Sequence, residues 1–227
     1  MTSKELALYL DSTILKDDAT KEDITQLCLD AKKYGFKSVC INPYYVEYAK
    51  TLLKNTNVLV CTVIGFPLGM NTLETKVFET RNAISSGADE IDMVVNISNL
   101  KSLNLDECLR EITAIKKECG SKILKVIVET SQLSLDQKIF ASNLILQSDA
   151  DFIKTSTGFI GSGANLEDIK LWKSILNNKK LIKAAGGIRD LQTCLNFINT
   201  GSDRIGTSNA KVILEELKNE SNFKINR

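Results

Sequence analysis

The chain has 227 residues, of which 43% are hydrophobic, which is enough to build one sizeable core. Its 29 Lys and Arg residues nearly balance its 28 Asp and Glu residues, so no long-range field favours nucleic acid or an anionic membrane as a partner. The chain contains no histidine, which excludes Ser-His-Asp hydrolysis and the common His-ligated zinc sites.

Short apolar runs rich in β-branched residues recur along the chain and predict eight strands. They cover residues 6–14, 37–42, 58–66, 90–95, 123–130, 151–157, 180–186 and 204–208. Helical periodicity lies between most of these runs and predicts helices over 21–35, 73–87, 105–120, 166–176 and 191–201. A closing helix is expected after Lys211.

Strands that alternate with helices favour parallel pairing, because each crossover between parallel strands needs a helix. A single closed (β/α)₈ TIM barrel fits the number of strands and the length of the chain. The competing architecture is a doubly wound open sheet, which usually has fewer strands, and no G-x-G-x-x-G follows the first strand here. No linker or shift in composition divides the chain, so we expect one α/β domain over residues 1–227.

The compartment is predicted from three features. The N-terminal residues lack the basic start, apolar run and cleavage site of a secretory signal. The longest apolar stretch, 58–70, is too short for a membrane span and contains Gly and Pro. The six cysteines form no C-x-x-C pair and are expected to be reduced, mostly buried thiols. We therefore expect a soluble, cytoplasmic protein.

Four charged residues lie inside runs that otherwise predict buried strands. They are Asp92, Lys125, Lys154 and Lys183, on the fourth to seventh predicted strands. An unpaired charge in a buried strand costs several kcal/mol, so these residues must compensate one another. One interpretation is a purely structural ion network inside the barrel.

The alternative is a catalytic site, because three lysines against one aspartate do not make a neutral lattice, although Asp11 and Glu129 are further acids that could contribute. An amine attacks a carbonyl only when it is unprotonated, and a free lysine has a pKa of about 10.4. Desolvation and a second nearby ammonium both favour loss of the proton, so Lys154 and Lys183 on adjacent strands could activate one another. Asp92 could then move protons through a water. The residues alone do not say which lysine is the nucleophile.

Glycines cluster after the last three predicted strands, in 157–163, 185–188 and 206–210. Backbone amides in such loops bind phosphate without net positive charge, and barrels often hold a phosphate after strands 7 and 8. Ordinary tight turns would use glycine in the same way. The candidate phosphate or substrate ligands are Gly158, Gly186, Gly187, Gly206, Ser208 and Asn209.

The sequence resembles the deoxyribose-phosphate aldolase family from about Asp11 to Asn209. The matching stretches are LDSTILKDDAT, VCINP, VIGFPLG, GADEIDMVVN, LKVIVET, FIKTSTGF, IKAAGGIR and GTS. The resemblance implies a (β/α)₈ barrel that reversibly cleaves 2-deoxy-D-ribose 5-phosphate to D-glyceraldehyde 3-phosphate and acetaldehyde, in deoxynucleoside breakdown. It implies no metal and no cofactor, and partners limited to the phosphorylated sugar and acetaldehyde; a homodimer is compatible with it.

The resemblance also assigns roles to individual residues. It implies that Lys154 forms the imine with acetaldehyde, that Lys183 perturbs its pKa and handles protons, and that Asp92 donates and accepts protons. Many members have a histidine at the position of Ser12 and often a proline at that of Asp17, and a small residue is common where this chain has Asn209. These departures lie outside the imine-forming motif.

Two other functions stay open at this stage. A Schiff-base aldolase for a longer sugar phosphate would share the lysine but need a larger mouth. A phosphosugar-binding barrel without catalysis would use its lysines structurally. Turnover of different sugar phosphates separates the first from the expected function, and borohydride trapping with acetaldehyde separates the second.

Overall fold

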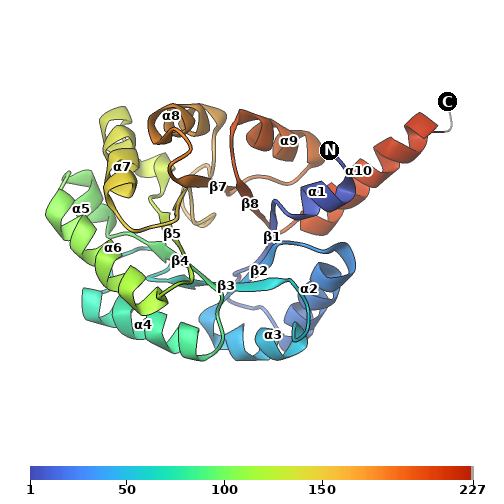
Figure 1. Ribbon diagram of the computed structural model, residues 1–227, viewed down its shortest axis with the longest axis horizontal. Coiled ribbons are helices and arrows are strands. Elements are labelled where there is room, and N and C mark those ends of the chain that lie inside the picture. The colour runs from blue at the N-terminus through green and yellow to red at the C-terminus, as the bar shows by residue number, and fades with distance from the viewer. Residues whose placement is uncertain (226–227) are drawn as a thin grey trace.

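The computed structural model describes residues 1–225, with side chains through residue 220, and its centre is a closed barrel of eight parallel strands (Figure 1). The strands are β1 (Leu10–Ile14), β2 (Ser38–Ile41), β3 (Leu59–Ile64), β4 (Glu90–Val94), β5 (Ile123–Ile127), β6 (Phe152–Lys154), β7 (Leu181–Ala185) and β8 (Arg204–Thr207). Each strand pairs with the next along the chain, and β8 closes the ring on β1. The predicted barrel is confirmed, with every strand inside its predicted run and shorter than it.

Helices surround the barrel and cover the outer face of the strands (Figure 1). They are α1 (Ser3–Ala7), α2 (Lys21–Tyr34), α3 (Val46–Leu52), α4 (Leu73–Ser85), α5 (Ile97–Lys101), α6 (Leu105–Cys119), α7 (Leu135–Gln147), α8 (Leu166–Leu176), α9 (Leu191–Thr200) and α10 (Ala210–Ile225), with short 3₁₀ turns at Pro43–Tyr45 and Thr130–Gln132. The five predicted crossover helices and the closing helix are all present. Helices α3, which connects β2 to β3, and α7, which connects β5 to β6, were not predicted, and neither were the short helices α1 and α5.

Helix α7 escaped prediction because its apolar residues do not mark out one face. The segment LDQKIFASNLILQ carries them on several sides, so a search for 3.6-residue spacing finds little contrast. Its start was nevertheless encoded, because Ser134 and Gln137 form a capping box in which each side chain accepts a hydrogen bond from the other's backbone N–H.

The apolar side chains of the strands mainly build a layer between the barrel and its helices. On β4, Ile91 and Met93 belong to this large outer core, whereas Asp92 between them points to the barrel axis. A second, much smaller apolar cluster consists of Leu15, Cys40, Cys61 and Val63, with Phe66 packed against it. Because most apolar side chains of the strands pack outward against the helices, much of the barrel interior is left to charged side chains.

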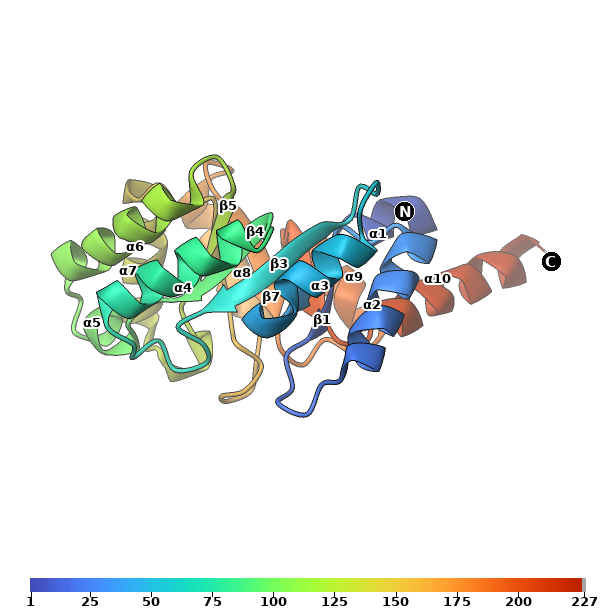
Figure 2. The same ribbon diagram turned by 90° about the horizontal axis from the view of Figure 1, so that it is seen from below.

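Loops at the C-terminal ends of the strands gather at one edge of the barrel. Figure 2 shows the loops that follow β1 and β6 projecting from the same side. In both views α10 extends away from the barrel body toward the C-terminus (Figures 1 and 2). No helix within residues 1–225 is long and apolar enough to cross a bilayer.

Candidate active site

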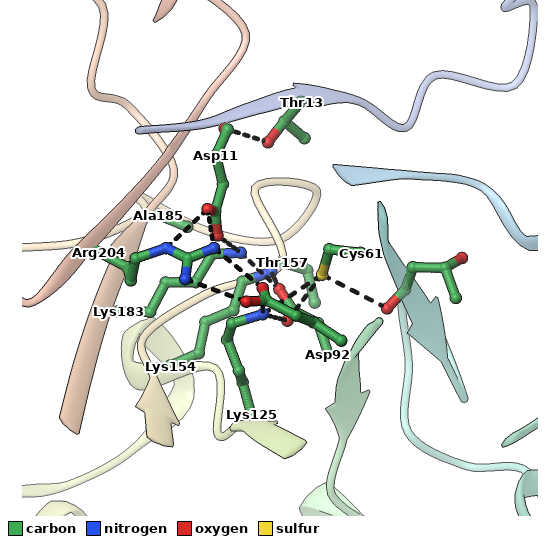
Figure 3. A network of polar contacts seen from close by, with 12 residues as sticks. Asp11, Thr13, Cys61, Asp92, Lys125, Lys154, Thr157, Lys183, Ala185 and Arg204 are labelled. Carbon is green, nitrogen blue, oxygen red and sulfur yellow. Dashed lines mark hydrogen bonds and ion pairs between the residues drawn. The ribbon is translucent and has the colours of Figure 1, made fainter. Parts of the chain in front are cut away.

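The Asp92 carboxylate is the hub of a buried network of charged side chains (Figure 3). Its Oδ2 accepts hydrogen bonds from Lys154 Nζ and Lys183 Nζ, both at 2.7 Å. Its Oδ1 accepts from Lys125 Nζ at 2.7 Å and from Cys61 Sγ at 3.1 Å. The three lysines that stood out in the predicted strands therefore meet at the carboxylate of the fourth charged residue, Asp92.

Strand register explains why these side chains converge. Asp92 on β4 is the direct neighbour of Lys125 on β5, and Lys154 on β6 is the direct neighbour of Lys183 on β7. Side chains at paired positions of parallel strands point to the same face, and here that face is the interior. Closure of the barrel then brings the two pairs together across its axis.

Three further residues complete the network: Asp11 on β1, Glu90 on β4 and Arg204 on β8. Lys183 Nζ lies 2.6 Å from Asp11 Oδ2, and Lys125 Nζ donates to Glu90 Oε2 at 2.6 Å. Arg204 donates to Asp11 and, at 2.9 Å, to Glu90 Oε2. Of the two further acids that the sequence offered, Asp11 joins this network. Glu129 does not, and its carboxylate instead accepts from Thr157 N and Thr157 Oγ1 at 3.0 and 2.6 Å.

The network contains four cationic groups and three carboxylates, so its formal charge is one positive unit when every group is ionised. Lys125, Lys183 and Arg204 each contact two carboxylates. Within residues 1–220, the Lys154 ammonium pairs with Asp92 alone. Lys154 is therefore the least compensated cation of the network.

The ionisation of the surrounding groups is set by their mutual contacts. Burial alone would raise the pKa of Asp92, but the ammonium groups of Lys125, Lys154 and Lys183 outweigh it and hold that pKa well below its usual range. Burial alone would lower the pKa of Lys183, but the carboxylates of Asp11 and Asp92 outweigh it and raise that pKa well above the ordinary value. Lys183 is therefore a permanent positive charge beside Lys154.

Lys154 is the one of the three lysines that reaches open space. It lies at the end of β6 and lines a cavity of about 420 Å³ at the mouth of the barrel. Lys125 and Lys183 are fully buried beneath it. A cavity of this size is typical of a site for a small molecule. The sequence placed Lys154 and Lys183 together on adjacent strands near the mouth; the structure pairs them on β6 and β7, but only Lys154 is among the residues that line the cavity.

The same cavity collects most of the predicted phosphate ligands. Gly158, Gly186, Gly187, Gly206 and Ser208 all line it. Asn209 is not among the lining residues, and its side-chain amide donates to the Arg189 carbonyl at 3.1 Å. The structure thus gives Asn209 a different contact: its side chain ties the loop after β8 to the loop after β7.

Two of these glycines lie in tightly packed surroundings. Gly186 has a φ of 88° and faces Gly163, where an added Cβ would come within 2.9 Å of the Gly163 Cα. At Gly206 an added Cβ would come within 3.1 Å of Lys183 Cε. The absence of a side chain at Gly186 lets the loop after β7 pack against Gly163 in the loop after β6. The absence of one at Gly206 leaves room for the buried Lys183 side chain.

Two cations at the cavity were not singled out from the sequence. Lys16, just after β1, and Arg189, just after the AGGI stretch, both line it with Ser208. The only sequence signal was their position one or two residues beyond strand ends or glycine loops. The family departures lie outside the lining: Ser12 is buried on β1, and Asp17 is exposed.

Comparison with known proteins gives a consistent result. Residues 5–207 match the model of a family described as DeoC/LacD family aldolase. The chain is 59% identical over 208 residues to the deoxyribose-phosphate aldolase of Ureaplasma urealyticum, covering 92% of this chain and 97% of that protein. It is 49% identical over 219 residues to the deoxyribose-phosphate aldolase of Caldicellulosiruptor saccharolyticus, covering 95% and 100%.

Among solved structures, the tetrameric deoxyribose phosphate aldolase of Aeropyrum pernix superposes with a TM-score of 0.89. The two chains are 33% identical, and the match covers 96% of this chain and 92% of that one. The likeness thus extends over nearly the whole barrel, including every strand that contributes to the charged network.

Proposed function

This chain belongs to the DeoC/LacD family of aldolases, and we propose that it reversibly cleaves 2-deoxy-D-ribose 5-phosphate to D-glyceraldehyde 3-phosphate and acetaldehyde through a Schiff base on Lys154. One observation carries the choice of nucleophile. Of the three lysines bonded to Asp92, Lys154 alone lines the cavity. It is also the cation of the network with a single carboxylate partner among residues 1–220.

The chemistry needs an uncharged amine at the start. Neutral Lys154 attacks the aldehyde carbon C1 of the open-chain sugar to give a carbinolamine, which loses water to become an imine. The imine accepts the electron pair of the C2–C3 bond as that bond breaks, so the 3-hydroxyl loses its proton and D-glyceraldehyde 3-phosphate leaves. The remaining enamine is protonated at carbon and hydrolysed, which releases acetaldehyde and regenerates the amine.

Lys183 and Asp92 serve this sequence in different ways. Lys183 stays charged and destabilises a second ammonium on the same Asp92 oxygen, which keeps Lys154 nucleophilic. Asp92 stays ionised because of the lysines around it. It therefore takes up a proton only transiently, as it relays protons between the groups bonded to it. Between these transfers it is a carboxylate.

The phosphate end of the sugar is assigned to the glycine loops of the cavity. Gly187 and Ser208, in the loops after β7 and β8, line the cavity together with the cations Lys16 and Arg189. Such loops beside the N-termini of α9 and α10 attract a phosphate. The phosphate would hold the sugar with its aldehyde end toward Lys154.

The proposed function is tested by turnover and trapping. We expect the purified chain to cleave 2-deoxy-D-ribose 5-phosphate and to leave fructose 1,6-bisphosphate uncleaved. Acetaldehyde with borohydride should add one reduced two-carbon unit, located by peptide mass at Lys154. Turnover of fructose 1,6-bisphosphate at a comparable rate would assign a different substrate, and absence of any adduct would favour a binding protein.

Replacing Lys183 with leucine should make the reaction alkaline-dependent. The fixed positive charge of Lys183 opposes a second ammonium beside it, and the substitution removes that repulsion. The rate at pH 7 should fall roughly 10- to 1,000-fold and recover as the pH rises. A pH profile of kcat measures this directly.

Lys125→Met is the matched control, because it also removes one buried ammonium from Asp92 but from the other carboxylate oxygen. Its profile should shift less than that of Lys183→Leu. A Lys183→Leu profile that stays parallel to that of the unmodified chain would contradict the charge-neighbour argument.

Assembly and compartment complete the proposal. The Aeropyrum pernix relative is a tetramer, and we extend self-association to this chain, with the homodimer as its simplest form. Light scattering during size-exclusion chromatography gives the mass in solution.

The six free, buried cysteines are in keeping with a reducing compartment such as the cytoplasm.

A further inference from the structure

Two buried thiols lie beside Asp92, and the aldolase mechanism uses neither. Cys40 on β2 and Cys61 on β3 are direct neighbours in the parallel register, and both side chains are fully buried in the small interior cluster. Cys61 Sγ lies 3.1 Å from Asp92 Oδ1. The ligand atoms of all three residues lie within 4.8 Å of one another.

This arrangement has the composition of a site for a thiophilic divalent cation. Two thiolates and one carboxylate are ligands that Zn²⁺ and Cd²⁺ accept, whereas Mg²⁺ and Ca²⁺ prefer oxygen alone. Tetrahedral coordination at normal zinc bond lengths puts the ligand atoms about 3.5–3.8 Å apart. The three side chains need only small movements to reach that spacing.

We infer that Cys40, Cys61 and Asp92 form an inhibitory binding site for a thiophilic divalent cation of the Zn²⁺ and Cd²⁺ class. Two thiolates and one carboxylate carry three negative charges against the two positive charges of the cation, and the ammonium groups around Asp92 balance the excess. Lys125, displaced from Asp92 Oδ1, still pairs with Glu90. Lys125 therefore keeps a carboxylate partner when the cation is bound.

Inhibition follows from the position of the site. The cation draws on the same carboxylate that holds Lys154 and Lys183, so Asp92 can no longer orient the nucleophile or pass protons. The site lies close to the substrate cavity, because Leu15 lines that cavity and also belongs to the cluster that contains both thiols. The inhibitory half of the inference rests on the proposed aldolase function, while the binding half does not.

Binding is measured without substrate, on the reduced 227-residue chain stripped of metal with EDTA. Titration with Cd²⁺ should produce a thiolate-to-cadmium ultraviolet absorption band that saturates at one equivalent. Protons should be released on binding in weakly buffered solution, and Mg²⁺ should do neither. Activity should fall in step with the band and return when EDTA is added.

Variants locate the site. Cys40→Ser and Cys61→Ser should each weaken Cd²⁺ binding at least as much as loss of an outer-shell partner does, about 10- to 100-fold. Cys108→Ser and Cys194→Ser are matched controls, because these thiols are buried on α6 and α9 outside the barrel. They should bind and be inhibited as the unmodified chain is.

Cys40→Ala and Cys61→Ala repeat the test should a serine variant fold poorly. No band in the unmodified chain, or a band that survives loss of both thiols, would overturn the site. A band at one equivalent with undiminished aldolase activity would overturn the inhibition while leaving the site. A chain that binds Cd²⁺ as described but never cleaves a sugar phosphate would count against the proposed function alone.

Discussion

Lys154→Leu should abolish the borohydride-trapped adduct and lower kcat by at least about 10⁴-fold, in line with the loss of an essential nucleophile in other enzymes. The reason is that the other two lysines on Asp92 are sealed beneath the cavity and cannot reach a substrate carbonyl. Mass spectrometry of the trapped protein and steady-state kinetics measure the two effects.

The substitution should leave the fold intact, because leucine at this position removes the one cation that has a single carboxylate partner. Asp92 keeps Lys125 and Lys183, and the network becomes charge-balanced. The urea midpoint of Lys154→Leu should therefore stay close to that of the unmodified chain.

Lys16→Leu is the matched control, since Lys16 is another lysine that lines the same cavity. It should form the adduct normally and lose affinity for the phosphorylated sugar instead. An adduct that persists in Lys154→Leu and disappears in Lys16→Leu would identify Lys16 as the nucleophile.

Asp92→Asn should lower kcat by roughly 10²- to 10⁴-fold, the range for loss of an acid–base group, and change KM much less. The amide cannot take up protons, and it removes the negative charge on which three ammonium groups converge. Breaking a buried ion pair on one side also costs about 3–5 kcal/mol of stability. Kinetics and urea unfolding are measured on the same preparation.

Glu90→Gln separates the catalytic loss from the electrostatic one. Glu90 is a fully buried carboxylate of the same network, but it contacts Lys125 and Arg204 and neither of the lysines on Asp92 Oδ2. It should lose comparable stability with a smaller fall in kcat. Equal losses of kcat in Glu90→Gln and Asp92→Asn would mean that activity depends on the total charge of the network. An equal change in kcat and KM for Asp92→Asn would make Asp92 a binding residue.

The architecture was readable from the sequence because strands and crossover helices leave local signals. Eight apolar runs, five periodic helices and glycines at helix ends were sufficient for the barrel. Helix α7 was missed because its apolar residues are not confined to one face, although the capping residue Ser134 marked its start. Charged residues inside apolar strands were the strongest pointer to the site, because burial of a charge demands a partner.

The roles within that site depend on contacts that no local pattern encodes. Asp92, Lys154 and Lys183 were visible as residues, but the pairing of Lys183 with Asp11 comes from strands at opposite ends of the chain that meet only when β8 closes on β1. Closure likewise buries Lys183 and leaves Lys154 at the cavity. Composition and periodicity thus determine which charges enter the barrel, while the register and closure of the strands decide which of them faces the substrate, because the depth of a side chain in a barrel depends on all eight strands together.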